Sequence, residues 1–147
     1  MPKVISVFKV KLPIRAVWSF MSDRKEVGCL FPGCLGVTIL NDLDSEWKVR
    51  VTFGPFSKTV IMKTHTTVFK EQEQLSWEGM GDHVRLSGDV ILRKISNDMT
   101  EVTYDLEGHV SGPFATLQEI VVYEKLREVK NKFIKNIKNE LGWVLED

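Results

Sequence analysis

Three side chains carry groups that could move a proton or hold a polar atom of a ligand. His83 follows Asp82 directly, and because an imidazole titrates near neutrality, the pair could act as acid and base or anchor a ligand. The same pair would equally suit an exposed turn. Tyr104 lies in an alternating apolar segment, where a buried phenol needs a hydrogen-bond partner. His83 and Tyr104 are therefore the catalytic candidates, and Tyr104 is the best polar contact for a ligand.

The other reactive side chains form no known catalytic or metal-binding motif. Cys29 and Cys34 are five residues apart with no second cysteine pair, so the sequence predicts neither a zinc site nor a Cys-x-x-Cys redox pair. His65 and His109 fall on the polar side of their segments, and we expect them at the surface. Nucleophile elbows, phosphate loops and dinucleotide-binding glycine patterns are absent from the sequence. We expect no metal ion and no cofactor.

Composition narrows the class of partner. Lys and Arg total 20 and Asp and Glu total 20 in 147 residues, so no overall field attracts nucleic acid, and we expect no nucleic-acid partner. The two cysteines are too few for a disulfide framework, and the first residues do not resemble a signal peptide. The cytoplasm is the expected location. The length predicts a single domain over residues 1–147. We expect a monomer or a homodimer, and the sequence does not decide between them.

Seven segments show the apolar and polar alternation of strands. They span Lys3–Leu12, Val37–Leu43, Trp47–Phe53, Thr59–Phe69, Leu75–Gly79, Val84–Leu92 and Val102–Val110. Short connections between consecutive strands predict an antiparallel meander. We interpret the isolated glycines Gly79, Gly81 and Gly88 as bulges that help the sheet curl.

Helices are expected at two places. Pro13 opens a short helix after the first strand, and Ser22 and Asp23 cap a second short turn that reaches Gly28. A long amphipathic helix should run from Phe114 to Leu141 and end at Gly142. Its apolar stripe has one spacing of five residues among spacings of three and four, and consists of Phe114, Leu117, Val121, Leu126, Val129, Phe133, Ile137 and Leu141. The opposite face is rich in lysine, and Glu128 and Lys132 are spaced to form an ion pair.

Four segments resemble a known family. They are Phe8–Asp23 (FKVKLPIRAVWSFMSD), Cys29–Gly33 (CLFPG), Val49–Phe56 (VRVTFGPF) and Val110–Leu117 (VSGPFATL). They are similar to the START/SRPBCC superfamily, and most similar to the branch that contains the G-subunit of carbon monoxide dehydrogenase and polyketide-cyclase/dehydrase-like proteins. The resemblance covers essentially the whole chain. Members of this branch can carry a C-terminal membrane tail, but this sequence ends at Asp147, so we expect no integral membrane anchor.

The resemblance implies a fold of the α+β class. This is the helix-grip (START/Bet v 1-like) fold, in which a seven-stranded curved antiparallel sheet wraps around a long C-terminal helix and two short helices follow strand 1. The superfamily includes lipid carriers, hormone receptors and cyclases. It therefore implies a ligand cavity between the sheet and the helix without naming the ligand.

Three Gly- or Pro-containing loops are expected at the mouth of such a cavity, namely residues 53–56, 80–83 and 111–114. These loops could instead be tight hairpin turns, and the aromatic residues near them could belong to the core. The residues expected to line the cavity are large and mostly apolar. They are Phe31, Phe53, Phe56, Val60, Met62, Trp77, Met80, Tyr104, Phe114, Leu117 and Val121.

Three functions remain open from the sequence. The first is non-catalytic binding of a small hydrophobic ligand, such as a lipid or an aromatic, polyketide-like metabolite. The second is a cyclase or dehydratase that uses the same pocket, with Tyr104 or His83 transferring protons. The third is an accessory or assembly protein for a metalloenzyme, which contacts a membrane surface or that enzyme through the basic face of the last helix.

Overall fold

The computed structural model describes residues 3–53, 56–112 and 119–145. The helices are α1 (Ile14–Met21), α2 (Arg24–Cys29) and α3 (Glu119–Leu141). The strands are β1 (Lys3–Val10), β2 (Cys34–Ile39), β3 (Asp44–Phe53), β4 (Phe56–Lys70), β5 (Gln74–Gly81), β6 (Val84–Ser96) and β7 (Met99–Val110).

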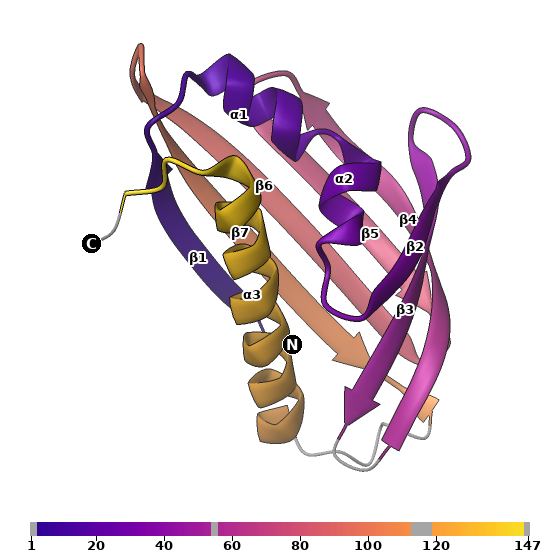
Figure 1. Cartoon of the computed structure of the whole chain (residues 1–147). Helices are drawn as coiled ribbons and strands as arrows, with labels where there is room; N and C mark the ends of the chain where they lie inside the picture. The colour runs from indigo at the N-terminus through magenta and orange to yellow at the C-terminus, as the bar shows by residue number, and fades with distance from the viewer. Residues whose placement is uncertain (1–2, 54–55, 113–118, 146–147) are drawn as a thin grey trace.

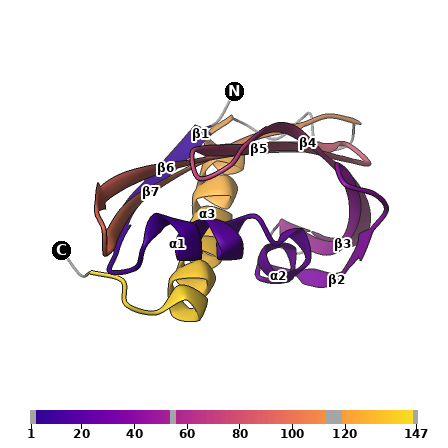
Figure 2. The same ribbon diagram turned by 90° about the horizontal axis from the view of Figure 1, so that it is seen from above.

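The strands form one antiparallel sheet, which confirms the predicted seven-stranded arrangement. Its order is β1-β7-β6-β5-β4-β3-β2, so each strand from β2 to β7 pairs with its neighbour in sequence. β1 joins the other edge by pairing with β7. α3 crosses the concave face of the sheet (Figure 1). Figure 2 shows β2 and β3 curling toward α2, on the same side of the sheet as α3. The three helices therefore lie on the side toward which the sheet curves.

The short helices lie where the sequence predicted them. Pro13 precedes α1, and the Asp23 side chain caps α2 by accepting a hydrogen bond from the Glu26 backbone N–H at 3.1 Å. Several strand limits differ from the prediction. β2 begins at Cys34 rather than Val37 and ends before residue 40. It ends there because the Asn41 side chain accepts bonds from two following backbone N–H groups and forms a turn.

The predicted bulges at glycines are wrong. The register shifts lie between Cys34 and Gly36, between Thr66 and Val68, and between Lys94 and Ser96. Gly88 instead makes room for a tryptophan, since a Cβ atom there would lie 2.3 Å from Trp77 Nε1. Gly79 and Gly81 make room for Met62 and Val60 in the same way. These glycines allow close approach within a regular ladder.

The apolar face of α3 differs from the prediction at its first turns. Phe114 and Leu117 lie outside the described residues. Val121 is 42% exposed, whereas Val122 is buried with Leu126, Phe133, Ile134 and Ile137. Val122 precedes Leu126 by four residues, whereas Val121 precedes it by five and is rotated off the face. The predicted end is confirmed, because Gly142 has φ +67° and donates a hydrogen bond to the Lys138 carbonyl at 2.9 Å.

Candidate functional site

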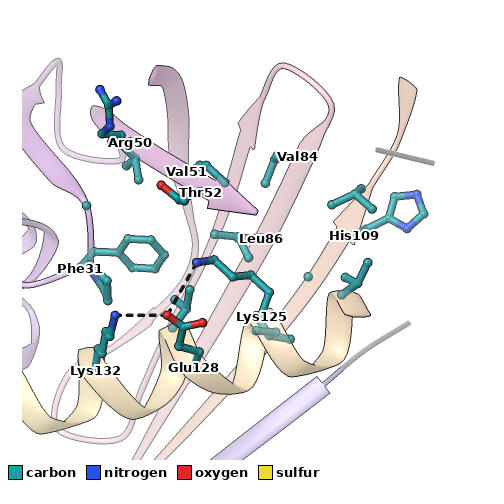
Figure 3. A pocket seen from close by; sticks show the side chains of 18 residues that line it. Phe31, Arg50, Val51, Thr52, Val84, Leu86, His109, Lys125, Glu128 and Lys132 are labelled. Atoms are coloured by element: carbon teal, nitrogen blue, oxygen red, sulfur yellow. Dashed lines mark hydrogen bonds and ion pairs between the residues drawn. The ribbon is translucent and has the colours of Figure 1, made fainter. Parts of the chain in front are cut away.

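A pocket with a volume of about 390 Å³ lies between α3 and the strands β3, β6 and β7. We call it the main pocket (Figure 3). Successive side chains of a strand point to opposite faces of the sheet, so every second side chain of these strands faces α3. Its lining is mostly apolar and consists of Phe31, Pro32, Gly33, Val49, Arg50, Val51, Thr52, Val84, Leu86, Gly108, His109, Val110, Val122, Lys125, Leu126, Glu128, Val129 and Lys132.

Many of the side chains that line the main pocket are small, and this helps to keep it hollow. Valines from three strands and from α3 provide much of its wall. Gly108 of β7 lies beneath the helix, where an added Cβ would be 3.3 Å from side-chain carbons of both Leu86 and Leu126. These residues form an apolar surface without filling the space that the curved sheet encloses. An apolar ligand surface would fit against such a wall.

Two ion pairs link three residues of α3 at the solvent-exposed edge of the main pocket, which we call its mouth (Figure 3). A Glu128 carboxylate oxygen lies 3.1 Å from Lys132 Nζ and 3.8 Å from Lys125 Nζ. The hydrogen bond from Lys132, followed by the charge of Lys125, lowers the pKa of Glu128. The predicted pair of Glu128 and Lys132 is thus confirmed. The Arg50 guanidinium and the His109 imidazole point away from the pocket.

Phe31 closes the inner end of the main pocket. It belongs to the loop between α2 and β2 and is only 5% exposed. Its ring centroid lies 5.6 Å from that of Trp47 and 5.3 Å from that of Phe133. The loop is tied to β3, because Arg50 donates its backbone N–H to the Gly33 carbonyl at 2.8 Å. Gly33 has φ +82°, a conformation that favours glycine.

A second, smaller space lies on the far side of Trp47. We call it the deep chamber, and its volume is about 30 Å³. It combines apolar with hydroxyl-bearing side chains and is lined by Met21, Arg24, Val27, Ser45, Trp47, Thr64, Thr66, Leu75, Trp77, Val90 and Tyr104. The Tyr104 hydroxyl accepts a hydrogen bond from Trp77 Nε1 at 3.0 Å. Trp47 Nε1 is the one buried side-chain nitrogen or oxygen without a hydrogen-bond partner in the described part of the chain.

The structure distributes the predicted lining residues over several places. Phe31 lines the main pocket, while Trp77 and Tyr104 line the deep chamber. Val60 and Met62 are buried on β4 and belong to neither space.

Other predicted lining residues are exposed or undescribed. Met80 is 52% exposed and Val121 is 42% exposed, and neither lines the main pocket. Phe53 and Phe56 are the ends of β3 and β4, but their side chains are outside the described part, as are Phe114 and Leu117.

The two catalytic candidates lie apart from the main pocket. Tyr104 is 1% exposed, and burial raises the pKa of its phenol. His83 is exposed in the turn between β5 and β6, where it adopts φ 62° and its carbonyl accepts the Ser111 N–H. Its neighbour Asp82 lies 4.0 Å from Lys58 Nζ. Neither catalytic candidate lines the main pocket.

Sequence reasoning missed most of the wall that α3 provides. Val122, Lys125, Leu126, Glu128 and Val129 all line the main pocket, and none was among the predicted lining residues. A signal existed in the helix periodicity, because counting back four residues from Leu126 selects Val122 instead of Val121.

Two kinds of feature are absent from the part of the chain that the structure describes. These residues contain no group of three or more His, Cys, Asp and Glu side chains placed to hold a metal ion. None of the described helices combines the length and apolarity needed to cross a bilayer.

Solved structures of similar shape share the whole fold. A conserved protein from Geobacillus kaustophilus has a TM-score of 0.80 and 17% identity over 95% of this chain and 94% of its own. A START superfamily protein from Mycobacterium smegmatis has a TM-score of 0.76 and 18% identity over 95% and 96%. The Zhui aromatase/cyclase from Streptomyces sp. R1128 has a TM-score of 0.64 and 16% identity over 95% and 90%.

These likenesses confirm the predicted helix-grip, START/Bet v 1-like fold. No curated protein sequence matches the chain. The family of the carbon monoxide dehydrogenase G-subunit (CoxG) matches residues 7–142. Since that match spans nearly the whole fold described above, the chain belongs to the CoxG family.

Proposed function

We propose that this protein binds a small hydrophobic molecule, such as a lipid or an aromatic metabolite, in the main pocket. The observation that carries the proposal is the apolar hollow of about 390 Å³ between α3 and the sheet. Pockets for small molecules commonly measure about 300–1,000 Å³ and are lined mainly by apolar side chains. The ion pairs of Glu128 lie at the mouth, so the apolar part of the ligand would occupy the interior of the pocket.

Burial of apolar ligand surface would supply the affinity. Each Å² removed from water contributes about 25 cal/mol, so about 200 Å² of buried apolar surface contributes about 5 kcal/mol before the entropic costs of association. The catalytic alternative has less support, because Tyr104 and His83 do not line the main pocket.

The proposal includes a location in the cytoplasm. Free thiols at Cys29 and Cys34 suit a reducing compartment.

Two neighbouring residues of α3 allow a controlled test. Val122 is 8% exposed and lines the main pocket, whereas Val121 is 42% exposed on another face. We would titrate 2-isopropylnaphthalene into the wild-type protein and into Val122→Phe and Val121→Phe. The ring added at Val122 occupies pocket volume and should weaken binding by roughly tenfold or more, while Val121→Phe should stay within about twofold.

Native mass spectrometry of protein purified from its own host would complement the titration. A co-purified small molecule, lost from Val122→Phe and kept by Val121→Phe, would name the ligand class. If no probe binds the wild-type protein and no molecule co-purifies, the binding proposal is wrong. Equal loss of binding in both variants would also count against the main pocket.

A second candidate function is contact with an anionic membrane surface. A groove of about 600 Å³ between α3 and β1 is lined by Lys130, Lys135, Lys138 and Trp143, among others. Trp143 is 73% exposed, and an amphipathic indole next to lysines suits the interface between lipid and water. This contact would let the protein exchange a hydrophobic ligand with a membrane.

Vesicle sedimentation can test this second candidate. The double change Lys135→Glu and Trp143→Ala should abolish binding to phosphatidylglycerol vesicles, because it removes both the charge and the indole. Lys63→Glu is the matched control, since Lys63 is exposed on β4 outside the groove. Binding that survives the double change, or that is equal for phosphatidylcholine vesicles, would contradict the candidate.

A further inference from the structure

The deep chamber is unusually polar for the interior of this protein. Ser45, Thr64 and Thr66 line it and are only 2%, 5% and 8% exposed. The Ser45 and Thr64 hydroxyls are hydrogen-bonded to each other, and the Thr64 hydroxyl also donates to the Ser45 carbonyl at 3.2 Å. These hydroxyls lie beside the aromatic rings of Trp77 and Tyr104, in a space that packing has left open.

Trp47, one of the residues that line this space, carries an unused hydrogen-bond donor. Its side chain lines the deep chamber and is only 5% exposed, yet its Nε1 has no partner among the described residues. An indole nitrogen can only donate, so its partner must be an acceptor. A buried donor without a partner costs free energy, because it has lost its hydrogen bond to water. The equivalent atom of Trp77 is satisfied by Tyr104.

The deep chamber continues the main pocket along one strand. Val49 and Val51 of β3 line the main pocket, and Ser45 and Trp47 line the chamber. Residues two apart on a strand share a face, so these four side chains form one row. Phe31 lines the main pocket, and its ring contacts Trp47. A shift of these two aromatic side chains along this row would join the spaces.

We infer that the deep chamber is the polar end of the ligand site, where Trp47 Nε1 donates a hydrogen bond to a carbonyl oxygen of the ligand. The inference rests on the proposed function and adds the chemical class of the ligand, an apolar body that ends in a ketone or similar carbonyl. A volume of about 30 Å³ accommodates one oxygen-sized group, since a water molecule needs at least about 10–15 Å³. The apolar body occupies the main pocket, and the carbonyl passes Phe31.

A pair of probes that differ in one group tests this assignment. 2-Acetylnaphthalene carries a carbonyl where 2-isopropylnaphthalene carries a CH and a methyl group, so their shapes are similar. In Trp47→Phe an aromatic ring remains but the donor is lost. This change should weaken binding of the ketone by about three- to tenfold, the value of one net hydrogen bond, and leave the hydrocarbon within about twofold.

Trp18→Phe is the matched control, because Trp18 is buried like Trp47, at 6% and 5% exposed, but lines neither the main pocket nor the deep chamber. It should leave the affinity for both probes unchanged.

Nuclear magnetic resonance of ¹⁵N-labelled wild-type protein gives a second readout that does not depend on the folding of Trp47→Phe. The indole N–H signal of Trp47 should move downfield when the ketone binds and shift less when the hydrocarbon binds.

The outcomes separate the inference from the proposed function. If both probes bind and Trp47→Phe weakens both equally, Trp47 contributes shape alone and the inference is overturned. An indole signal that is already downfield without ligand, and that the ketone does not move, would indicate a resident water and would also overturn it. If neither probe binds the wild-type protein, the proposed function fails, and the inference fails with it.

Discussion

The space between α3 and the sheet is filled at one end, except for the deep chamber of about 30 Å³, and hollow at the other. At the filled end, Trp47 lies 5.1 Å from Trp77, and Tyr104 lies 5.4 Å from Phe133, measured between ring centroids. At the hollow end, the same sheet presents Val84 and its neighbours to the same helix. The difference shows that side-chain size, and not a change of fold, decides where this framework has room for a ligand.

The largest effect should come from removing an aromatic ring at the filled end. Phe133 is fully buried and contacts both Phe31 and Tyr104, so Phe133→Ala should lower the free energy of unfolding by about 3–5 kcal/mol. Leu126→Ala on the same helix is the comparison, because Leu126 borders the main pocket and already lacks neighbours on one side. Leu126→Ala should lower the free energy of unfolding by about 2 kcal/mol, as measured by urea denaturation. Equal losses would mean that the two ends are equally well packed.

A smaller effect should follow from adding a ring. Val90 is 1% exposed at the filled end and lines the deep chamber, whose volume of about 30 Å³ is too small for the added ring, so Val90→Phe should destabilise the protein by about 1–3 kcal/mol through overpacking. Val84→Phe places the same ring at the hollow end, where the main pocket can accept it, and should cost less than about 1 kcal/mol. Thermal and urea denaturation of both variants measure this contrast. A Val84→Phe protein as unstable as Val90→Phe would show that the pocket closes in solution.

The smallest effect concerns the ion pairs at the mouth of the hollow end. The pKa of Glu128 is lowered in the folded protein, so its contribution to stability is present above the unfolded pKa of about 4.3 and is lost as pH falls through the lower, folded value. The pair with Lys132 is exposed, and Glu128→Gln should cost about 0.3–0.5 kcal/mol at pH 7. Urea denaturation at pH 7 and pH 3 should show that this cost disappears in acid. A cost that persists at pH 3 would assign it to packing.

Much of the fold could be predicted because it depends on patterns that repeat along the chain. Alternation in segments such as the one around Tyr104 predicted the strands, and short connections predicted their antiparallel order. The end of β2 was harder to predict, because it is set by a turn that the Asn41 side chain forms and not by an apolar pattern. Gly88 was misinterpreted since its role depends on a neighbouring strand, where Trp77 needs the space.

The candidate site could be predicted only in part, since a hollow depends on what neighbouring side chains fail to fill. Trp77 and Leu86 both fit the inward alternation of their strands, yet one lines the small deep chamber and the other the main pocket. Periodicity does not distinguish them. The unpartnered Trp47 Nε1 was equally beyond reach, because the lack of an acceptor among the described residues appears only when all surrounding elements are in place.

The wall that separates the two spaces comes partly from the loop between α2 and β2, so the length of the proposed ligand site depends on one loop side chain. Phe31 lies outside the sheet and outside α3, so a smaller residue there would lengthen the site while leaving every strand register intact. Gly33 holds the loop against β3, where a Cβ atom would lie 2.3 Å from the Arg50 carbonyl oxygen. The loop's path is thereby fixed while the size of one of its side chains is free to vary. Under the proposed function, a substitution at this single loop position would change the length of ligand that the site accepts.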